Sequence, residues 1–484
     1  AGYDVGRPDG TSNGHRWSFV HDFTHNCRDL CVKEARNFCH HRTDLNSMKR
    51  IKFLKTSSVL VAGSMLSPLI SCDSRAKGVR KNWAGNYEYE AKEYYEPKTL
   101  AELQTVMKRA GNRKALGSGH SFNDIADSPL SQISTKHFNK LLAIDEQAMT
   151  VTVEGGARYG QFAPELHKRG YALHNLASLP HISVAGACAT ASHGSGVKNG
   201  NLSSAVAGLE LLTASDELVS LTRDKDGALF NGAVVGLGAL GFITKLTLDI
   251  QKTYQVCQDV FQDMPLPSLE AHLDEIMASG YSVSLFTDWQ SKKISQVWVK
   301  RKVEGDTKSM GPDFFGAKAA TKNLHPITKL SAENCTEQMG VPGPWYERLP
   351  HFKMGFTPSS GDELQSEYFV PQLNALEAFK ALERLGSTIY PQLMISEIRT
   401  VAADEFWMSP CYNQACVAFH FTWKPNWDEV KPILLKIEAE LAPFKARPHW
   451  GKLFKVDPKE LKERYEMQPE FLQLARMYDP QGKF

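Results

Sequence analysis

The chain has 484 residues, of which 42% are hydrophobic and 23% are charged, and its formal net charge at pH 7 is +2. This composition is typical of a globular protein that is large enough for two domains. No basic block or interleaving of arginine with aromatic residues suggests nucleic acid as a partner.

Residues 1–47 are polar, rich in His and Asn, and without sustained periodicity, so we expect a disordered leader or upstream extension. This segment contains Cys27, Cys31, Cys39 and the pair His40–His41. A structural zinc site needs four ligands in a paired arrangement, and only Cys27 and Cys31 form such a pair. We therefore expect no metal.

Residues 48–72 have the organisation of a secretory signal. A basic run from Met48 to Lys55 precedes an apolar run from Val59 to Ile70, which is too short to span a bilayer of roughly 30 Å. The closing sequence Leu69-Ile-Ser-Cys72 resembles the lipobox of bacterial lipoproteins, in which the cysteine is acylated. We expect a periplasmic or cell-envelope lipoprotein anchored through Cys72 if this signal is used, and a cytoplasmic protein otherwise. A buried core helix is the alternative interpretation.

Five cysteines remain after this signal. An odd number at irregular spacing does not make a disulfide framework, so we expect free, buried thiols. They are Cys188, Cys257, Cys335, Cys411 and Cys416.

Residues 80–250 are predicted to form a first domain. Apolar spacing predicts helices, and alternation of apolar and polar residues predicts strands. An aromatic strand is expected near Lys81–Tyr87. Helices are expected at Leu100–Ala110 and Tyr159–Arg169, a hairpin at Leu142–Glu154, and strands at Lys114–Gly117, Val206–Leu212, Leu218–Leu221 and Phe242–Ile250. Strands and helices mixed without strict alternation favour an α+β fold.

Two segments rich in small residues lie within this domain, Ala115–Asn123 and Ser178–Gly196. Gly117 and Gly119 allow main-chain N–H groups to point into one concavity, which suits a diphosphate. Ordinary turns are the alternative interpretation. Neither segment matches the nicotinamide-dinucleotide fingerprint or the P-loop pattern. Together they predict two walls of one elongated anionic ligand.

Residues 251–452 are predicted to form a second domain, because the chain becomes richer in aromatic residues and poorer in glycine near Gln251. Residues 453–484 are expected to return to the first domain. Expected helices are Leu266–Ser279, Leu373–Leu385, Trp427–Leu441 and Pro458–Met467, and expected strands are Ser282–Phe286 and Ser295–Lys300. Gly305–Lys329 lacks periodicity and is predicted to be a mobile surface loop.

Three segments of the second domain carry polar side chains at strand spacing. Glu397 and Arg399 are two residues apart, as are His420 and Thr422, so each pair shares one face of a strand. Lys452 follows a glycine farther along the chain. A surface salt bridge and a core histidine are the alternative interpretations. A carboxylate, guanidinium, imidazole, hydroxyl and ammonium lining one pocket would suit a polyol.

The motifs GSGHS, SLPHISVAG, ATASHGSG and GLGALGFIT occur in this order and resemble the FAD domain of the vanillyl-alcohol-oxidase type flavoproteins. The resemblance implies a two-domain flavoprotein: an FAD-binding domain of two α+β subdomains, and a substrate (cap) domain built on an antiparallel sheet with flanking helices. It implies covalent attachment of FAD through His120. The implied FAD-binding residues are Ala115, Leu116, Gly117, Ser118, Gly119, His120, Ser121, Ser183, Gly186, Thr190, Ala191, Ser192, His193 and Ile243.

The motifs SEIRT, HFTW and HWGK resemble the substrate motifs of the alditol oxidases. The resemblance implies Arg399, Lys452, His420 and Glu397 as catalytic residues, with Ser178 and Thr422 as further substrate contacts. It implies oxidation of the terminal hydroxyl of xylitol or sorbitol to the aldose, with hydride transfer to FAD and dioxygen reduced to hydrogen peroxide. Small Ala177 would leave dioxygen room to reach the flavin.

Two other functions stay open. One is an aldonolactone oxidase or dehydrogenase acting on gulono- or arabinono-1,4-lactone; in that group alanine more commonly stands where this chain has Gly451. The other is a polyol-binding lipoprotein without catalysis. A monomer is the favoured oligomeric state.

Overall fold

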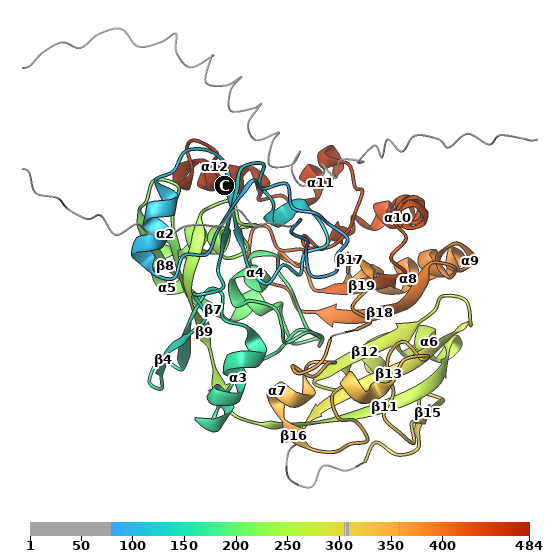
Figure 1. Ribbon diagram of the computed structural model, residues 1–484. Coiled ribbons are helices and arrows are strands. Elements are labelled where there is room, and N and C mark those ends of the chain that lie inside the picture. Colours follow the sequence, from blue (N-terminus) through green and yellow to red (C-terminus); the bar gives the residue numbers. More distant parts are fainter. Residues whose placement is uncertain (1–78, 304, 306–308, 358) are drawn as a thin grey trace, which may run out of the picture.

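The computed structural model describes residues 79–484 with gaps at 304, 306–308 and 358, and this part of the chain is built on three main β-sheets (Figure 1). The predicted leader, the signal segment 48–72 and the expected acylation site Cys72 lie outside the described residues. Among the helices that are described, none is both long enough and apolar enough to cross a bilayer.

The first sheet has three parallel strands in the order β1–β3–β2. Its elements are β1 (Glu93–Tyr95), α2 (Leu100–Met107), β2 (Arg113–Leu116) and β3 (Ser131–Ser134). Helix α2 begins after Thr99, whose side chain accepts a hydrogen bond from the N–H of Glu102 and caps the helix. Strand β2 ends at Leu116, so the first small-residue segment leaves the carboxyl edge of this sheet.

The second sheet has five antiparallel strands in the order β4–β5–β9–β7–β8. Its strands are β4 (Leu141–Asp145), β5 (Thr150–Glu154), β7 (Val206–Leu212), β8 (Leu218–Thr222) and β9 (Phe242–Asp249), and its helices are α3 (Tyr159–Lys168), α4 (Val184–Ala189) and α5 (Arg223–Val234). Along β9, fully buried residues alternate with half-buried ones, as the alternating sequence predicts. Helix α4 begins directly after Ser183, in the middle of the second small-residue segment.

The third sheet has ten strands in the order β14–β15–β11–β13–β12–β18–β19–β17–β20, with β16 paired to β11. Its strands are β11 (Gln255–Pro265), β12 (Ser282–Thr287), β13 (Lys293–Lys302), β14 (Asp313–Phe314), β15 (Ala317–Ala319), β16 (Gly343–Pro344), β17 (Leu364–Pro371), β18 (Leu393–Val401), β19 (Cys416–Trp423) and β20 (Arg447–Pro448). All of its pairs are antiparallel.

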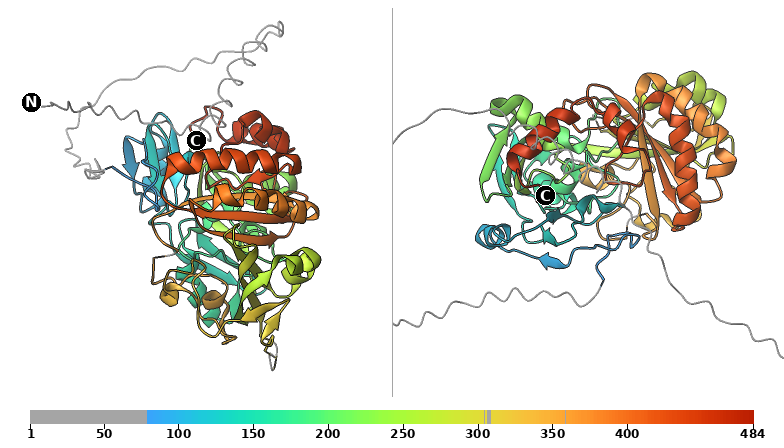
Figure 2. Two further views of the ribbon diagram at one scale, coloured as in Figure 1. Left: turned by 90° about the vertical axis from the view of Figure 1, so that its right-hand side faces the viewer. Right: turned by 90° about the horizontal axis from the view of Figure 1, so that it is seen from above.

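Helices cover one face of this large sheet and leave the other face to the first two sheets (Figures 1 and 2). They are α6 (Leu266–Ala278), α8 (Ala375–Arg384), α9 (Gly386–Ile389) and α10 (Trp427–Leu441). On β17, Tyr368 points to the helix side, where its hydroxyl donates to Glu438 of α10 at 2.8 Å. Because side chains alternate along a strand, its neighbour Glu367 points the opposite way.

Shorter elements complete the described part. They are β6 (Tyr171–Ala172) paired with β10 (Gln251–Lys252), α7 (Trp345–Arg348), α11 (Pro458–Arg464), α12 (Gln468–Tyr478), and the 3₁₀ turns η1 (Asp124–Ala126), η2 (Leu202–Ala205), η3 (Ala332–Asn334), η4 (Gln372–Asn374) and η5 (Ala442–Phe444). Helix α12 packs on α5, where a Cβ at Gly232 would lie 2.8 Å from Leu474. Beyond it, the Lys483 carbonyl accepts a hydrogen bond from the N–H of Arg113 at the start of β2.

The α+β class and most predicted elements are confirmed, but two predictions are wrong. Lys81–Tyr87 does not form a strand; it forms a turn closed by an isolated bridge between Lys81 and Glu88. Gly305–Lys329 is not simply a surface loop, because it contributes β14 and β15 to the large sheet and buries Phe314 and Ala317. Strands of two and three residues are too short for any periodicity to be recognised.

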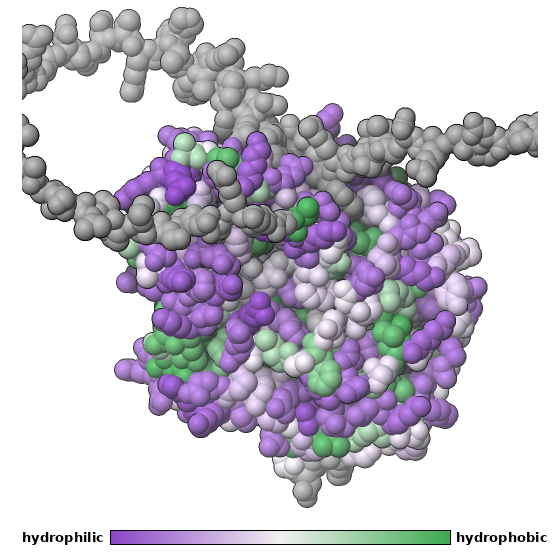
Figure 3. Space-filling view, in the orientation of Figure 1, coloured by the Kyte–Doolittle hydropathy of each residue, from purple (hydrophilic) through white to green (hydrophobic). Residues whose placement is uncertain are grey.

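The five cysteines of the described chain are free and buried, as predicted. The face of the molecule drawn in Figure 3 is mostly hydrophilic, with apolar areas that are small and separate. The apolar side chains are instead gathered in the interior, where the largest buried cluster runs continuously from β5 and α3 to β19 and α10.

Candidate active site

The two small-residue segments lie against each other. The N–H of Ser118 donates to Ser183 Oγ at 3.3 Å, and the N–H of Ser183 donates to Ser118 Oγ at 3.1 Å. Gly117 faces Ser183 so closely that a Cβ there would lie 2.4 Å from Ser183 Oγ. Only a residue without a side chain allows this approach. The two segments form adjoining walls, as the sequence predicts.

His120 stands at the end of the first segment, and its surroundings keep it neutral. Gly119 precedes it with φ +71°, a conformation that glycine adopts without strain. The ring of His120 stacks on Trp83, with centroids 4.8 Å apart and an interplanar angle of 17°. Burial lowers the pKa of His120 to about 3, and the neighbouring His181, Arg158 and Lys452 contribute to the decrease. Its Nδ1 is buried and has no hydrogen-bond partner among the described residues.

Strands β18, β19 and β17 bring the polar residues of the large sheet into register. Glu397 is paired with His420, and His420 is paired with Glu367 on the next strand. In the adjacent row, Thr422 lies between Ile395 and Gln365. Residues two apart on a strand share a face, so both rows project from the face opposite the helices.

Arg399 is held between two carboxylates. Its Nη2 donates to Glu367 Oε1 at 2.6 Å, and its Nε lies 3.6 Å from Glu397 Oε1. Its Nη1 donates to Ser178 Oγ at 3.3 Å, which connects the sheet to the second small-residue segment. Burial opposes charge on all three ionised groups, but their mutual attraction outweighs it: the pKa values of Glu367 and Glu397 lie well below the usual range and that of Arg399 is raised.

The contact between Glu367 and His193 extends this ionic cluster into the second segment. Nε2 of His193 lies 3.1 Å from Glu367 Oε1, and its Nδ1 lies 2.8 Å from the Gly194 carbonyl. Both side chains of the pair are about fully buried, with 1% exposed. His193 therefore links the wall opposite the sheet to the carboxylate that holds Arg399.

Glu397 also contacts His351, which in turn contacts Lys300. His351 Nε2 lies 2.8 Å from Glu397 Oε1, and Lys300 Nζ lies 3.0 Å from His351 Nδ1. Lys300 also donates to the carbonyls of Leu349 and Pro350. Because the ammonium can only donate, His351 Nδ1 accepts and its proton resides on Nε2, which donates to Glu397. Burial lowers the pKa of His351 to about 4.

Lys452 contacts His420 and Gln365, which are on the neighbouring strands β19 and β17. Its Nζ donates to Gln365 Oε1 and is 3.1 Å from His420 Nε2. Burial lowers the pKa of Lys452 to about 8, although Glu367 favours the charged form. Burial and the charge of Lys452 hold the pKa of His420 well below its usual range, so His420 is neutral. The backbone here is close to the His120 turn, since the N–H of Phe122 donates to the Gly451 carbonyl at 2.8 Å.

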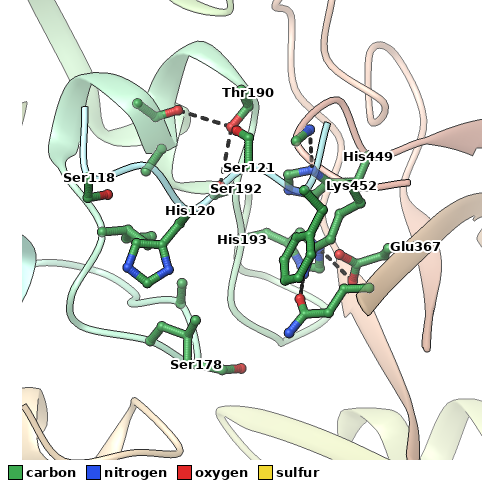
Figure 4. Close-up of a pocket in the computed structure, with 18 of the residues that line it drawn as sticks. Ser118, His120, Ser121, Ser178, Thr190, Ser192, His193, Glu367, His449 and Lys452 are labelled. Atoms are coloured by element: carbon green, nitrogen blue, oxygen red, sulfur yellow. Dashed lines mark hydrogen bonds and ion pairs between the residues drawn. The ribbon is translucent and has the colours of Figure 1, made fainter. Parts of the chain in front are cut away.

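One cavity connects these groups. Figure 4 shows His120 and Ser178 on one side of it, with Lys452, His449 and Glu367 on the other. All the predicted substrate and catalytic residues line it: Ser178, Glu397, Arg399, His420, Thr422 and Lys452. Twelve of the fourteen predicted FAD-binding residues line it too. The exceptions are Ala191, which is 1% exposed, and Ile243, neither of which is part of the cavity wall.

Sequence reasoning missed several polar residues of this wall, among them Gln365, Glu367, His351, His449 and His325. Gln365 and Glu367 carry the same spacing of two that identified Glu397 and Arg399. Their strand β17 was not predicted, because all but its last residue are fully buried and its sequence does not alternate. His351 lies on a connecting segment and carries no local signal.

The residues present fit FAD. The paired segments supply backbone N–H groups and hydroxyls without a charged side chain, which suits a diphosphate. Neutral His120 lines this cavity, and its buried Nδ1, which has no hydrogen-bond partner among the described residues, is the type of group that can act as a nucleophile. The positive groups Arg399 and Lys452 lie farther along the same cavity.

Comparison with known families finds two matches. Residues 91–222 match an FAD binding domain, and residues 362–484 match the D-arabinono-1,4-lactone oxidase family. The first match contains the His120 turn and the second segment, and the second contains the polar strands β17 to β19 and Lys452.

Curated relatives match over most of the chain. An alditol oxidase from Streptomyces sp. is 47% identical over 407 residues, covering 83% of this chain and 96% of the relative. An L-gulono-1,4-lactone dehydrogenase from Mycobacterium tuberculosis is 28% identical, covering 83% and 96%. An L-gulonolactone oxidase from Mus musculus is 24% identical, covering 84% and 97%.

Among solved structures, the fold is similar to a solvent-stable cholesterol oxidase, with a TM-score of 0.67 at 14% identity over 84% of this chain and 95% of that one. The cholesterol oxidase from B. sterolicum matches to the same extent. These matches show the fold, and together with the FAD binding domain match over residues 91–222 they confirm the predicted two-domain flavoprotein architecture.

Proposed function

This chain belongs to the alditol oxidase family of FAD-dependent oxidoreductases, and we propose that it oxidises the terminal hydroxyl of an alditol such as xylitol or sorbitol to the aldose, with dioxygen reduced to hydrogen peroxide. One observation carries the choice of a polyol: the cavity that contains His120 is lined by a buried carboxylate, guanidinium, imidazole and hydroxyl from strands β17 to β19, and by the half-buried Lys452. Neighbouring hydroxyls of a polyol can both donate to and accept from such a set.

FAD, when bound, accepts the hydride from the carbinol carbon. The protein's own residues bind and activate the substrate. Arg399 is buried and Lys452 is half-buried, and these two positive groups hold the reacting oxygen and stabilise the negative charge that develops on it. Glu397, Ser178 and Thr422 hydrogen-bond the hydroxyls and fix which carbon reacts.

Proton removal is assigned to His420. The ring is neutral, and its Nε2 faces Lys452 Nζ at 3.1 Å, next to the group that holds the reacting oxygen. Nε2 is also 3.1 Å from Gln365 Oε1, and a neutral imidazole can accept the hydroxyl proton when the substrate oxygen replaces these contacts.

Two features of the FAD side belong to the same proposal. Neutral His120, with its unpartnered Nδ1, attaches the flavin covalently. Ala177, which lines the cavity beside Ser178, leaves room for dioxygen and favours an oxidase over a dehydrogenase. Export as a lipoprotein through the signal at 48–72, and a monomeric state, are also part of the proposal.

A second candidate is oxidation of an aldonolactone, supported by the family match over residues 362–484. Gly451 separates the two candidates. A methyl group at this position would lie 3.2 Å from Ser121 Oγ, so alanine would press the Lys452 turn against the His120 turn. A polyol-binding protein without catalysis is disfavoured, because His120, Arg399 and Lys452 all line one cavity.

The test is a steady-state assay with xylitol, sorbitol and L-gulono-1,4-lactone, in which hydrogen peroxide and the sugar product are both measured. The proposal predicts one peroxide per aldose formed from xylitol or sorbitol, and little turnover of the lactone. Turnover of the lactone alone would assign the second candidate. Acid precipitation of the same sample tests the covalent bond, since flavin attached to His120 stays with the precipitated protein.

A further inference from the structure

His325 lies in the segment between β15 and η3 and lines the same cavity as the catalytic groups, yet the function proposed above gives it no role. The side chain is deeply buried, with 2% of the residue exposed. Its Nδ1 accepts a hydrogen bond from the backbone N–H of Ile327 at 2.9 Å. A backbone N–H can only donate, so the proton of the neutral ring resides on Nε2.

The Nε2–H of His325 is a buried donor that lacks a hydrogen-bond partner among the described residues. The backbone of Ser359 lies close enough to favour a proton on the ring but makes no hydrogen bond with Nε2. Burial lowers the pKa of His325 to about 4, so the ring stays neutral and presents a single donor. Buried donors are rarely left unsatisfied, and because His325 is part of the cavity wall, an acceptor on a bound ligand would satisfy this one.

His325 lies in an apolar part of the cavity wall, so its donor has few competing polar groups nearby. The cavity wall next to it is apolar, because Phe286, Ile327, Phe352 and Ile395 belong to one buried cluster. The rings of His325 and Phe352 are 5.6 Å apart. Ile395 shares its strand face with Glu397 and Arg399, two and four residues farther along β18. The donor therefore belongs to the part of the cavity beyond Glu397, away from Arg399.

Resting on the proposed function, we propose that His325 is a further substrate-binding residue, whose Nε2–H binds a hydroxyl oxygen of the alditol remote from the reacting carbon. Arg399 and Lys452 hold the reacting end, and His325 holds the distal end. An alditol of five or six carbons extends beyond the Glu397 row toward this donor, whereas glycerol ends sooner. His325 thus selects substrates by chain length.

Two amide substitutions separate the binding role from the turn contact with Ile327. The oxygen of an Asn side chain overlies Nδ1 of a histidine, whereas the nitrogen of a Gln side chain overlies Nε2. His325→Asn therefore keeps the acceptor for the Ile327 N–H and removes the donor in the cavity. His325→Gln keeps a donor in the cavity and removes the acceptor in the turn.

The experiment measures anaerobic flavin reduction of the holoenzyme by xylitol, sorbitol and glycerol, giving a Kd and a limiting rate for each. His325→Asn is expected to raise the Kd of xylitol and sorbitol by roughly 3- to 12-fold, the effect of one neutral hydrogen bond, with the limiting rates and the Kd of glycerol unchanged. His325→Gln is expected to have the wild-type Kd for all three alditols.

The inference is overturned if His325→Asn binds xylitol as the wild type does, if it weakens glycerol equally, or if His325→Gln rather than His325→Asn shows the loss. Failure of the proposed function has a different signature, because then none of the three alditols reduces the wild-type flavin; that result removes both proposals together.

Discussion

At the scale of single residues, the site depends on buried charges that compensate one another. Arg399 contacts Glu367, Glu397 and Ser178, and each of the three ionised groups is at most 6% exposed. Buried charges are tolerated when they are paired and hydrogen-bonded, and removing one partner leaves the others uncompensated. The same arrangement that holds the guanidinium at the cavity wall therefore makes the site sensitive to substitution.

Arg399→Ala is expected to abolish reduction of the flavin by xylitol, because the group that holds the reacting oxygen is lost. It also leaves Glu367 buried without its cation, which should lower the free energy of unfolding by roughly 3–5 kcal/mol. Stopped-flow reduction and thermal unfolding measure the two effects. Arg223→Ala is the control, since Arg223 forms an exposed pair with Asp249 and should change neither quantity appreciably. Retention of full reduction by Arg399→Ala would remove Arg399 from the site.

Lys452 gives a pH dependence whose sign follows from its charge. The ammonium is present below its pKa of about 8 and is lost above it. If the ammonium holds the reacting oxygen, the rate of flavin reduction should be constant below this pH and should fall as the pH rises through it. Lys452→Arg should move the fall to higher pH, because a guanidinium stays charged. A rate that instead rises through pH 8 would mean that the neutral amine acts as a base.

At the scale of elements, three neighbouring strands bring together residues that are far apart in the chain. Glu397 and Arg399 on β18, and His420 and Thr422 on β19, could be predicted to share faces because the period of a strand is two residues. That β18 and β19 pair in register, with β17 on the outer side of β19, depends on tertiary pairing that no local pattern reveals. Glu367 was missed for this reason.

In the rest of the fold too, elements with a clear sequence periodicity were predicted, and elements that depend on tertiary pairing were missed. Trp427–Leu441 was predicted with the bounds of α10, because its apolar residues follow helical spacing and one face is exposed. Strand β17 is buried on both faces, and the short strands β14 and β15 are held by the edge of the large sheet. Such elements are specified by their partners, and sequence periodicity alone does not identify them.

Lys300 on β13 provides a test of the contacts behind Glu397. Lys300→Met leaves the carbonyls of Leu349 and Pro350 without their donor and frees His351 to change its tautomer. We expect a lower free energy of unfolding, by roughly 1–3 kcal/mol, and a raised Kd for xylitol. Thermal unfolding and flavin titration measure these. Lys318→Met, at an exposed lysine of β15 in the same sheet, is the matched control. An unchanged Kd for xylitol in Lys300→Met would show that the contacts of Lys300 with His351 and of His351 with Glu397 are not needed to position Glu397.

At the scale of the whole molecule, the cavity exists because two parts of the chain meet. The small-residue segments come from the first two sheets, and the polar rows come from the face of the third sheet that lies opposite its helices. Contacts such as Arg399 to Ser178, and Gly451 to Phe122, cross between them. The last residues return to the first sheet, where Phe484 packs beside Ala115 against the cluster of Leu103 and Phe242.

This return predicts an effect of truncation on the cofactor. Deleting residues 480–484 removes the Lys483 carbonyl that accepts from Arg113, and the Gly482 carbonyl that accepts from Asn112, at the start of the strand that leads to His120. We expect a lower thermal midpoint and less bound FAD, with an unchanged limiting rate in the loaded fraction. The ratio of flavin to protein absorbance measures the loading. Full loading at the wild-type midpoint would show that the tail contributes nothing to the FAD site.

The central claim is that one cavity holds flavin and alditol together, and its most direct test is the visible flavin spectrum of the wild-type protein mixed anaerobically with xylitol. The account predicts that the flavin absorbance bleaches, and that it returns on admission of air with one hydrogen peroxide per flavin. A flavin that stays oxidised with xylitol but bleaches with L-gulono-1,4-lactone would contradict the account and assign the cavity to an aldonolactone.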